Sequence, residues 1–363
     1  MPEQPLSKQA SYSAIPTVQV NDQLDAKIAN TLLGMEMREQ EAGMSSMELR
    51  FSNFVSFPGG MAGLVFEDGK LLQLGTALTV SAGDVSSATE IFRGRITAIE
   101  GRFLRDMDSP EVVVLLEDAL QGARMRRRTR TWDVSSVGEI ANQIAAGLGL
   151  TPVVSGLDAN TGTEQQFNET DIRFLRRLLA RYDADLQIVA GELHVSLRGQ
   201  VQRSSLQLDM NDQLREVRVL ADLAHQVSQV TATGWDYQQG QRISVTSQST
   251  SFGLGSGTTG KDWLVQALKA RSEQLGQFSN LNQTEAQALV DAEFLQRRRR
   301  FTVAHGVAVG NPKLRVGCWL TLTGLGARFS NTYYTTEALH RYDTARGYET
   351  EFTGECAYLG NAA

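Results

Sequence analysis

The stretch Val316–Leu322, VGCWLTL, repeats the pattern of Leu74–Val80, LGTALTV, which occurs much earlier in the chain. Downstream of each copy a second pair of segments matches: Ile96–Phe103 reads ITAIEGRF and Thr335–Tyr342 reads TTEALHRY. A further strand-like segment follows each of these. A chance resemblance between strand sequences is one explanation of the repeat. The other is a duplication, which predicts two similar antiparallel β-barrels in one chain.

The remaining sequence fits a mainly β protein with an α/β insert. Short apolar or alternating segments separated by Gly, Asn, Asp and Ser are typical of antiparallel barrels or sandwiches. They predict a first barrel over residues 16–125 and a second over residues 205–363. The second barrel is interrupted at about 250–300 by helical and Gly-rich sequence. Residues 126–204 combine helical and strand patterns and form the α/β insert, and residues 1–15 predict a flexible arm.

Within the insert, Thr170–Ser196 predicts a helix followed by a hairpin. Thr170 is suited to cap the helix, and Asp171 lies at the positive end of its dipole. A glycine in Ala190-Gly191 permits the positive φ of a tight turn. The apolar residues recur first at helical spacing and then at strand spacing. They are Ile172, Leu175, Leu178, Leu179 and Tyr182 in the helix, and Leu186, Ile188, Leu193 and Val195 in the hairpin.

An earlier segment, Ser136–Ala146, predicts a partner helix. Ser136 is followed three residues later by Glu139, which is the spacing of a capping box. Gly147 or Gly149 supplies the left-handed stop. Two helices and a hairpin therefore form one small α/β module.

Composition excludes several classes of protein. The chain has 363 residues, a net charge of −6 and 21% charged residues, which argues against a general nucleic-acid binder. The N-terminus lacks the apolar core of a secretory signal. The longest apolar run, Val112–Leu116, is far too short to cross a bilayer.

The sequence offers no catalytic or metal-binding pattern, so we expect neither an enzyme nor a cofactor. Glu117 and Asp118 are adjacent in a predicted strand and point to opposite faces, which is poor geometry for an acid–base pair. Cys318 and Cys356 are interpreted as buried thiols, and a disulfide is the alternative. The four histidines lack ligand spacing; they are His194, His225, His305 and His340.

The loop Gly255–Asp262, GSGTTGKD, is one residue away from a phosphate-binding G-x-x-x-x-G-K-[ST] motif. The last position of that motif offers a hydroxyl to Mg²⁺, whereas Asp262 places a carboxylate near the phosphates. The preceding segment is polar and does not predict a buried parallel strand. We therefore expect a surface loop with Asp262 as a helix N-cap, and a nucleotide-dependent assembly factor is a remote alternative.

Two arginine runs are the strongest charge features. One reading is a solvated connector and a charged helix end, where cations suit the negative end of the dipole. The other is an interface with an acidic partner. The candidate interface residues are Arg126, Arg127 and Arg128 in the first run and Arg297, Arg298, Arg299 and Arg300 in the second.

The order of these segments resembles the late control D family of phage tail hub proteins. It is also similar to the N-terminal half of the VgrG proteins of type VI secretion. The resemblance covers residues from about 16 to 360, and its most specific part is Gly310–Phe352. The matching residues there are Gly310, Pro312, Leu314, Arg315 and Gly317, followed by Tyr333, Thr336, His340 and Tyr342.

The resemblance implies a non-enzymatic baseplate hub of a contractile phage tail or tail-like injection system. It implies a homotrimeric ring of six barrels that joins a sixfold tail tube to a threefold spike. The chain ends at Ala363, which predicts that the spike is a separate protein. Barrel edge strands are expected to pair or pack between subunits, because exposed edges otherwise aggregate.

The same resemblance gives the partners and the location. The partners are the chain itself, a spike protein, a tail tube or tube-initiator protein, baseplate wedge proteins and LysM-type adaptors, without nucleic acid or membrane insertion. The insert is similar to the LysM-like module of hubs and is expected to clamp neighbours; a cell-wall or glycan-binding tail protein is the alternative. We expect cytoplasmic assembly, then a virion or tail-like particle that is extracellular after release.

Overall fold

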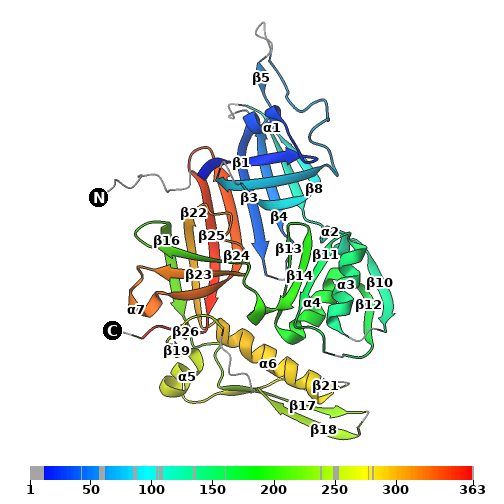
Figure 1. The fold of residues 1–363 in the computed structure, drawn as a ribbon, viewed down its shortest axis with the longest axis vertical. Helices are drawn as coiled ribbons and strands as arrows, with labels where there is room; N and C mark the ends of the chain where they lie inside the picture. The colour runs from blue at the N-terminus through cyan, green and yellow to red at the C-terminus, as the bar shows by residue number, and fades with distance from the viewer. Residues whose placement is uncertain are drawn as a thin grey trace, which may run out of the picture.

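The computed structural model describes most of the chain: residues 12–41, 43–56, 62–84, 88–103, 105, 109–133, 136–159, 161–237, 239–247, 253–276, 278–279 and 282–361. The protein is mainly β, and its largest sheet has 13 strands. Figure 1 shows four parts, which we call the first β-unit (blue and cyan, top), the second β-unit (centre left), the insert (green, right) and the outgrowth (yellow, bottom).

The first β-unit begins earlier than the sequence predicts. Its strand β1 starts at Tyr12, inside the predicted flexible arm, and pairs antiparallel with β7; residues 1–11 lie outside the described residues. The elements of this unit are β1 (Tyr12–Val20), β2 (Gln23–Leu24), α1 (Ala26–Thr31), β3 (Leu32–Gln40), β4 (Ser46–Ser52), β5 (Val55–Ser56), β6 (Ala62–Gly63), β7 (Ala77–Asp84), β8 (Thr89–Arg102) and β9 (Glu111–Glu117).

The second β-unit repeats the strand order of the first. Its elements are β15 (Ser204–Asp209), β16 (Leu214–Ala221), β22 (Thr302–Val309), β23 (Cys318–Thr323), α7 (Gly326–Phe329), β24 (Asn331–Asp343), β25 (Gly347–Cys356) and β26 (Tyr358–Leu359). The sheet runs β3-β4-β9-β8-β7 in one unit and β16-β22-β25-β24-β23 in the other. In both units, therefore, the five strands have the same order in the sheet when they are numbered along the chain.

Local geometry repeats at the segments that the sequence pairs. Gly75 and Gly317 both have positive φ, 86° and 84°. The Gly75 N–H donates to the carbonyl of Ile96 at 2.8 Å, and the Gly317 N–H donates to that of Thr335 at 2.9 Å. At both acceptors the pairing register shifts, between Ile96 and Ala98 and between Thr335 and Glu337. Because bulges are specific local features, this agreement supports duplication over chance.

The two units share one continuous sheet and keep separate cores. They join where β24 pairs antiparallel with β3, from Glu337 opposite Gln40 to Asp343 opposite Gly34. One buried apolar cluster lies in the first unit and also includes Tyr342 and Tyr348 from the second. Another lies within the second unit, around Leu320 and Tyr333. The joint is therefore packed as well as hydrogen-bonded.

The insert confirms the predicted helix-plus-hairpin. Thr170 caps α4 by accepting from the Arg173 N–H, and Ser136 caps α3 by accepting from the Glu139 N–H. The hairpin turns at Ala190-Gly191, both with positive φ. The predicted apolar residues form the buried core, with Tyr182 at its margin. The elements are α2 (Gln121–Arg124), β10 (Arg127–Trp132), α3 (Val137–Gly147), β11 (Thr151–Ser155), β12 (Glu164–Thr170), α4 (Asp171–Leu179), η1 (Ala180–Tyr182), β13 (Ala184–Val189), β14 (Glu192–Leu197) and η2 (Arg198–Gln200).

The outgrowth interrupts the second unit between β16 and β22 and has its own small apolar core. Its first helix ends after Leu268, because Lys269 adopts a positive φ of 75°. The long second helix begins at a complete capping box of Asn282 and Glu285. The elements are β17 (Gln229–Asp236), β18 (Gln241–Thr246), β19 (Thr258–Thr259), α5 (Gly260–Leu268), β20 (Ser272–Gln274), β21 (Phe278–Ser279) and α6 (Gln283–Arg299).

Candidate assembly surfaces

The motif residues after Gly310 gather at the joint between the two β-units. The Arg315 guanidinium binds both carboxylate oxygens of Glu39, with Nε to Oε2 at 2.6 Å. The backbone N–H of Val316 also donates to Glu39 Oε2, at 3.3 Å. Glu39 belongs to β3 and is 2% exposed. A buried carboxylate with three donors is well satisfied, so this pair fixes the first unit against the turn before β23.

His340 lies in the same joint and is completely buried. Its Nδ1 lies 2.7 Å from the hydroxyl of Tyr348. Burial, and then the nearby Arg315 charge, lower the pKa of His340 to about 3. The imidazole is therefore neutral at physiological pH and has a packing role in the joint.

The other motif residues shape the chain around this pair. Gly310 lies against Tyr348, whose Cδ1 is 2.2 Å from where a Cβ would stand. Pro312 is buried in the turn, and Leu314 is fully buried. Tyr342 packs into the core of the first unit. The structure thus brings these motif residues together as a structural joint.

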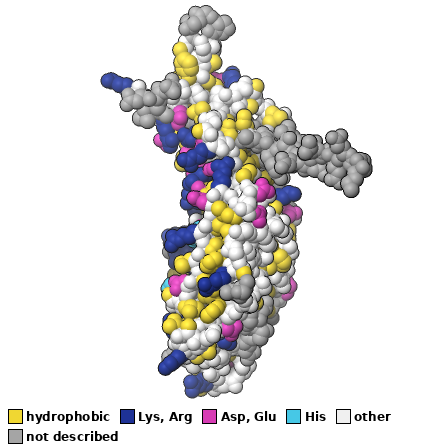
Figure 2. All heavy atoms as spheres, turned by 90° about the vertical axis from the view of Figure 1, so that its left-hand side faces the viewer, with side chains coloured by type: hydrophobic (Ala, Val, Ile, Leu, Met, Phe, Trp, Pro, Cys, Tyr) yellow, Lys and Arg dark blue, Asp and Glu magenta, His cyan; other side chains and the backbone are white. Residues whose placement is uncertain are grey.

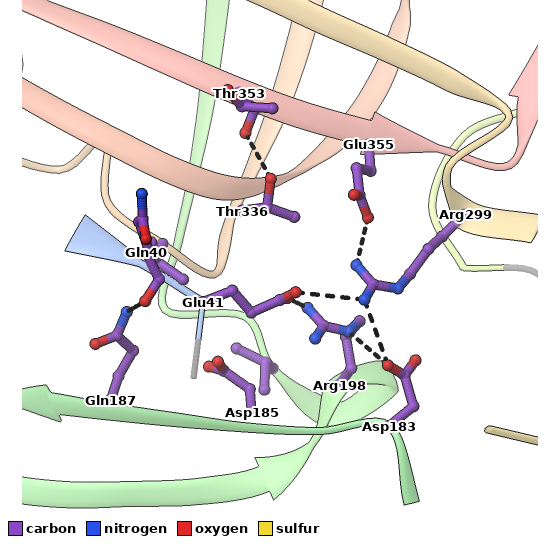
Figure 3. Close-up of polar contacts among 12 residues, drawn as sticks. Gln40, Glu41, Asp183, Asp185, Gln187, Arg198, Arg299, Thr336, Thr353 and Glu355 are labelled. Carbon is purple, nitrogen blue, oxygen red and sulfur yellow. Dashed lines mark hydrogen bonds and ion pairs between the residues drawn. The ribbon is translucent and has the colours of Figure 1, made fainter. Parts of the chain in front are cut away.

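A second polar cluster, which we call the polar junction, ties the insert to both β-units (Figure 3). Arg198 of the insert binds Glu41, just after β3, and its Nε lies 3.3 Å from Asp183 Oδ1. Arg299 at the end of α6 binds Glu355, and its Nη2 is 3.3 Å from Glu41 and 3.5 Å from Asp183. Four separate segments of the chain therefore meet at two guanidinium groups.

Burial dominates the electrostatics of the polar junction. It lowers the pKa of Arg198 to about 9, and repulsion from Arg299 acts in the same direction. Burial also raises the pKa of Asp183, while the charge of Arg299 opposes this shift. Removing one guanidinium would leave buried carboxylates without compensation. The junction is consequently a fixed contact that depends on all its members.

The first arginine run forms a strand, where the sequence suggested a solvated connector. Arg127 and Arg128 begin β10, which pairs with β12 from Arg127–Thr170 to Trp132–Glu164. Arg126, Arg127 and Arg128 are all exposed. Arg128 lies 3.3 Å from Asp171, and Arg127 donates weakly to the Asn168 carbonyl at 3.4 Å. Consecutive arginines carry no alternation of apolar and polar residues, so the sequence does not predict this strand.

The second run is mostly used within the molecule. Arg297 binds Glu273 and Glu293, the latter at 2.8 Å. Arg298 is 1% exposed and its guanidinium stacks 5.1 Å from the Phe294 ring. Arg299 belongs to the polar junction. Only the Arg300 side chain, 58% exposed, keeps much of its surface open to a partner among these four.

Comparisons with known proteins identify a family for most of the chain. A family model described as "Alg8 N-terminal domain" matches residues 63–343. The chain belongs to this family. No curated protein matches it in sequence.

Solved structures that resemble this Alg8 N-terminal domain member are tail and secretion proteins. The 43 kDa tail protein of prophage MuSo2 from Shewanella oneidensis has a TM-score of 0.65 at 13% identity, covering 93% of this chain and 97% of that one. The E. coli c3393 protein, a component of the type VI secretion system with structural similarity to the T4 tail proteins gp27 and gp5, has a TM-score of 0.60 at 12% identity, covering 95% and 79%. A chain of the Francisella PdpA–VgrG complex has a TM-score of 0.52 at 9% identity, covering 96% and 53%. The resemblance to tail hub and VgrG proteins is confirmed at the level of the fold.

In this family member the Gly-rich loop is closed against the second β-unit. A Cβ on Gly255 would stand 2.6 Å from Cys356 Sγ, and one on Gly257 would stand 2.3 Å from the Leu359 carbonyl. The Ser256 N–H donates to Asn331 at 3.0 Å. The predicted N-cap was wrong by three residues: Thr259 caps α5, because its hydroxyl accepts from the Asp262 N–H.

No metal-binding cluster of His, Cys, Asp and Glu occurs among the described residues. Cys318 and Cys356 are buried free thiols there, and the disulfide alternative is wrong. Nor is any described helix long and apolar enough to cross a membrane.

One face of the joined sheet is concave and charged. It encloses a pocket of about 570 Å³ that is lined by residues of β3, β24, β25, β22 and β16. Its charged lining residues include Arg38, Glu216, Arg218, Glu337, Arg341 and Glu351. Figure 2, which views the side that bears β16 and α5 in Figure 1, shows both charge signs interspersed above and hydrophobic side chains gathered below. β16 and α5 carry exposed Leu220, Val265 and Leu268. Such apolar exposure is typical of surfaces that contact other proteins.

Proposed function

We propose that the protein is a structural hub of a contractile phage tail or tail-like injection particle. Three copies would form a ring that joins a sixfold tail tube to a separate threefold spike. The repeated β-unit carries this proposal, since three chains with two similar units each supply six similar positions around one axis. The tail-protein fold of the similar solved structures supports it. The role is mechanical, without catalysis or a cofactor.

Within this proposal each β-unit is a barrel domain, with boundaries near residues 16–125 and 205–363. The LysM-like insert, residues 126–204, is a clamp on the outside of the ring. The polar junction supports the clamp. Arg198 of the insert binds Glu41 of the first unit, and Asp183 of the insert binds Arg299 at the end of α6, which also binds Glu355 of the second unit. A glycan-binding module would not need such a rigid attachment to both.

The proposed partners are the chain itself, a spike, the tail tube or its initiator, wedge proteins and LysM-type adaptors. The sequence-predicted candidates with the exposure that a docking contact needs are Arg126, Arg127, Arg128 and Arg300. Assembly in the cytoplasm precedes incorporation into the particle.

The test is a mass measurement of the purified full chain, with and without its spike protein, followed by negative-stain imaging. The proposal expects three times the 39.8 kDa of one chain and a hollow ring with six lobes. A protein that stays monomeric in both conditions, or a particle that assembles normally without the chain, would contradict it.

A further inference from the structure

Two strand edges are open in a single chain. Residues 98–102 of β8 pair with β9 on one side, and among the described residues no strand pairs with their other side. At the far end of the sheet, β16 pairs within the described chain only with β22. Open edges with unpaired N–H and C=O groups are templates for pairing with another chain.

The internal repeat shows what covers such an edge. In the second unit the positions equivalent to residues 98–103 are 337–342, and β3 pairs with them. Ala338 and Tyr342 are 1% and 6% exposed there. Their equivalents in β8, Ile99 and Phe103, are 41% and 65% exposed. Ile99 and Phe103 are thus apolar at positions whose equivalents in β24 are covered by β3. In a single chain no described strand covers them.

The strand that is equivalent to β3 is β16. Both have a register shift near their start, between Leu32 and Gly34 in β3 and between Leu214 and Glu216 in β16. This alignment places Val217 and Val219 where Met35 and Met37 stand. The two methionines face Tyr342 and His340 across the joint. The two valines are half-buried on the core side of β16.

We propose that β8 of one copy pairs antiparallel with β16 of the next, as β24 pairs with β3 inside each chain. The proposal rests on the trimeric hub above and names the contact that closes it. The equivalent register sets Ile99 opposite Ala221, Gly101 opposite Val219 and Phe103 opposite Val217. One apolar row meets another, so the interface buries no unpaired charge. Repeated head to tail three times, this contact closes a ring of six β-units.

The opposite face of the proposed pair carries balanced charges. Arg102 and Arg218 stand across from each other, which alone would be unfavourable. Glu100 lies diagonal to Arg218, and Glu216 lies diagonal to Arg102, within reach of long side chains. Glu100 already binds Arg102 at 2.9 Å within one chain. Glu216 and Arg218 belong to the charged concave face, which the pairing continues into the next subunit.

The pairing is tested with cysteines in the full chain. The variant Ile99→Cys/Ala221→Cys is expected to give a closed covalent trimer after mild oxidation, and reduction returns single chains. The matched control Ile99→Cys/Leu220→Cys shifts one cysteine to the other face of the strand and is expected to stay uncrosslinked. A second variant, Phe103→Asp, changes a mostly exposed side chain and is expected to abolish the trimer while the chain remains folded by circular dichroism.

The outcomes separate this inference from the hub proposal. A trimer by mass that does not cross-link through 99 and 221, or that survives Phe103→Asp, overturns the pairing alone. A chain that stays monomeric with and without spike overturns both. Cross-links of equal yield in the control would also overturn the proposed register.

Discussion

Glu39 of β3 and Arg315 before β23 form a two-pronged ion pair across the joint of the two β-units. They are 276 residues apart in the chain, and Glu39 is almost inaccessible to solvent. The pair thus couples the packing of one unit to that of the other.

Removing one partner of this ion pair is expected to lower the free energy of unfolding strongly. Glu39→Ala leaves the Arg315 guanidinium buried without its partner, and such changes cost about 3–5 kcal/mol. The double variant Glu39→Leu/Arg315→Met replaces the pair by apolar side chains and is expected to recover most of the loss. Urea unfolding of wild type, single and double variants measures both effects. Equal losses in single and double variants would contradict a charge-based explanation.

Gly317 is expected to tolerate substitution less well than its repeat partner Gly75. Both have positive φ, so Ala costs about 1–2 kcal/mol of backbone strain at each. At Gly317 a Cβ would also stand 2.6 Å from Arg203 and 2.8 Å from Val201, whereas at Gly75 nothing lies within 4 Å. Thermal unfolding of Gly317→Ala and Gly75→Ala should give the larger loss for Gly317. If both variants lost the same stability, Arg203 and Val201 would be able to move away from the new Cβ at position 317 without a loss of stability.

Asp118 is expected to make stability depend on pH. Burial raises its pKa to about 6, against hydrogen bonds from the Ser45 and Leu120 N–H groups, and Glu39 adds to the rise. Because the pKa is higher in the folded than in the unfolded chain, protonated Asp118 contributes up to ~3 kcal/mol to the free energy of unfolding. This contribution is complete below about pH 4 and is lost as the pH rises through about 6.

The measurement for Asp118 is the difference in unfolding free energy between wild type and Asp118→Asn from pH 4 to pH 7. Wild type should lose stability relative to the variant as pH rises across this window. The Asn amide lies beside the Ser45 and Leu120 N–H groups and changes the unfolding free energy by an amount that does not depend on pH. Comparing how the unfolding free energy of the two proteins changes with pH removes this constant difference. Parallel pH profiles for the two proteins would refute the assignment.

Local patterns in the sequence were sufficient for the repeated unit and the insert. Gly75 and Gly317, and the caps Thr170 and Ser136, have effects within a few residues, so their signals are visible in short segments. The polar junction could not be predicted, because Glu41, the insert residues Asp183 and Arg198, Arg299 and Glu355 come from four segments that only the tertiary fold brings together. Four identical residues in a row also give no sign of which side chain is buried. Arg298 is buried and Arg300 is exposed. The β24·β3 joint was missed for the same reason, since neither strand indicates its neighbour.

Arg299 and Arg300 offer a matched test of the polar junction. Arg299→Ala removes the contact between α6 and the insert and leaves Glu41, Asp183 and Glu355 with too little positive charge, at a cost of about 3–5 kcal/mol. Arg300→Ala changes a side chain that is 58% exposed and touches Glu355 at 3.3 Å, so its cost should stay within about 0.5 kcal/mol. Hydrogen exchange should show faster opening of η1 and β13 in the Arg299 variant only. If both variants exchange like wild type, the junction does not hold the insert; if Arg299→Ala alone opens, Arg300→Glu becomes the substitution that probes docking without disturbing the fold.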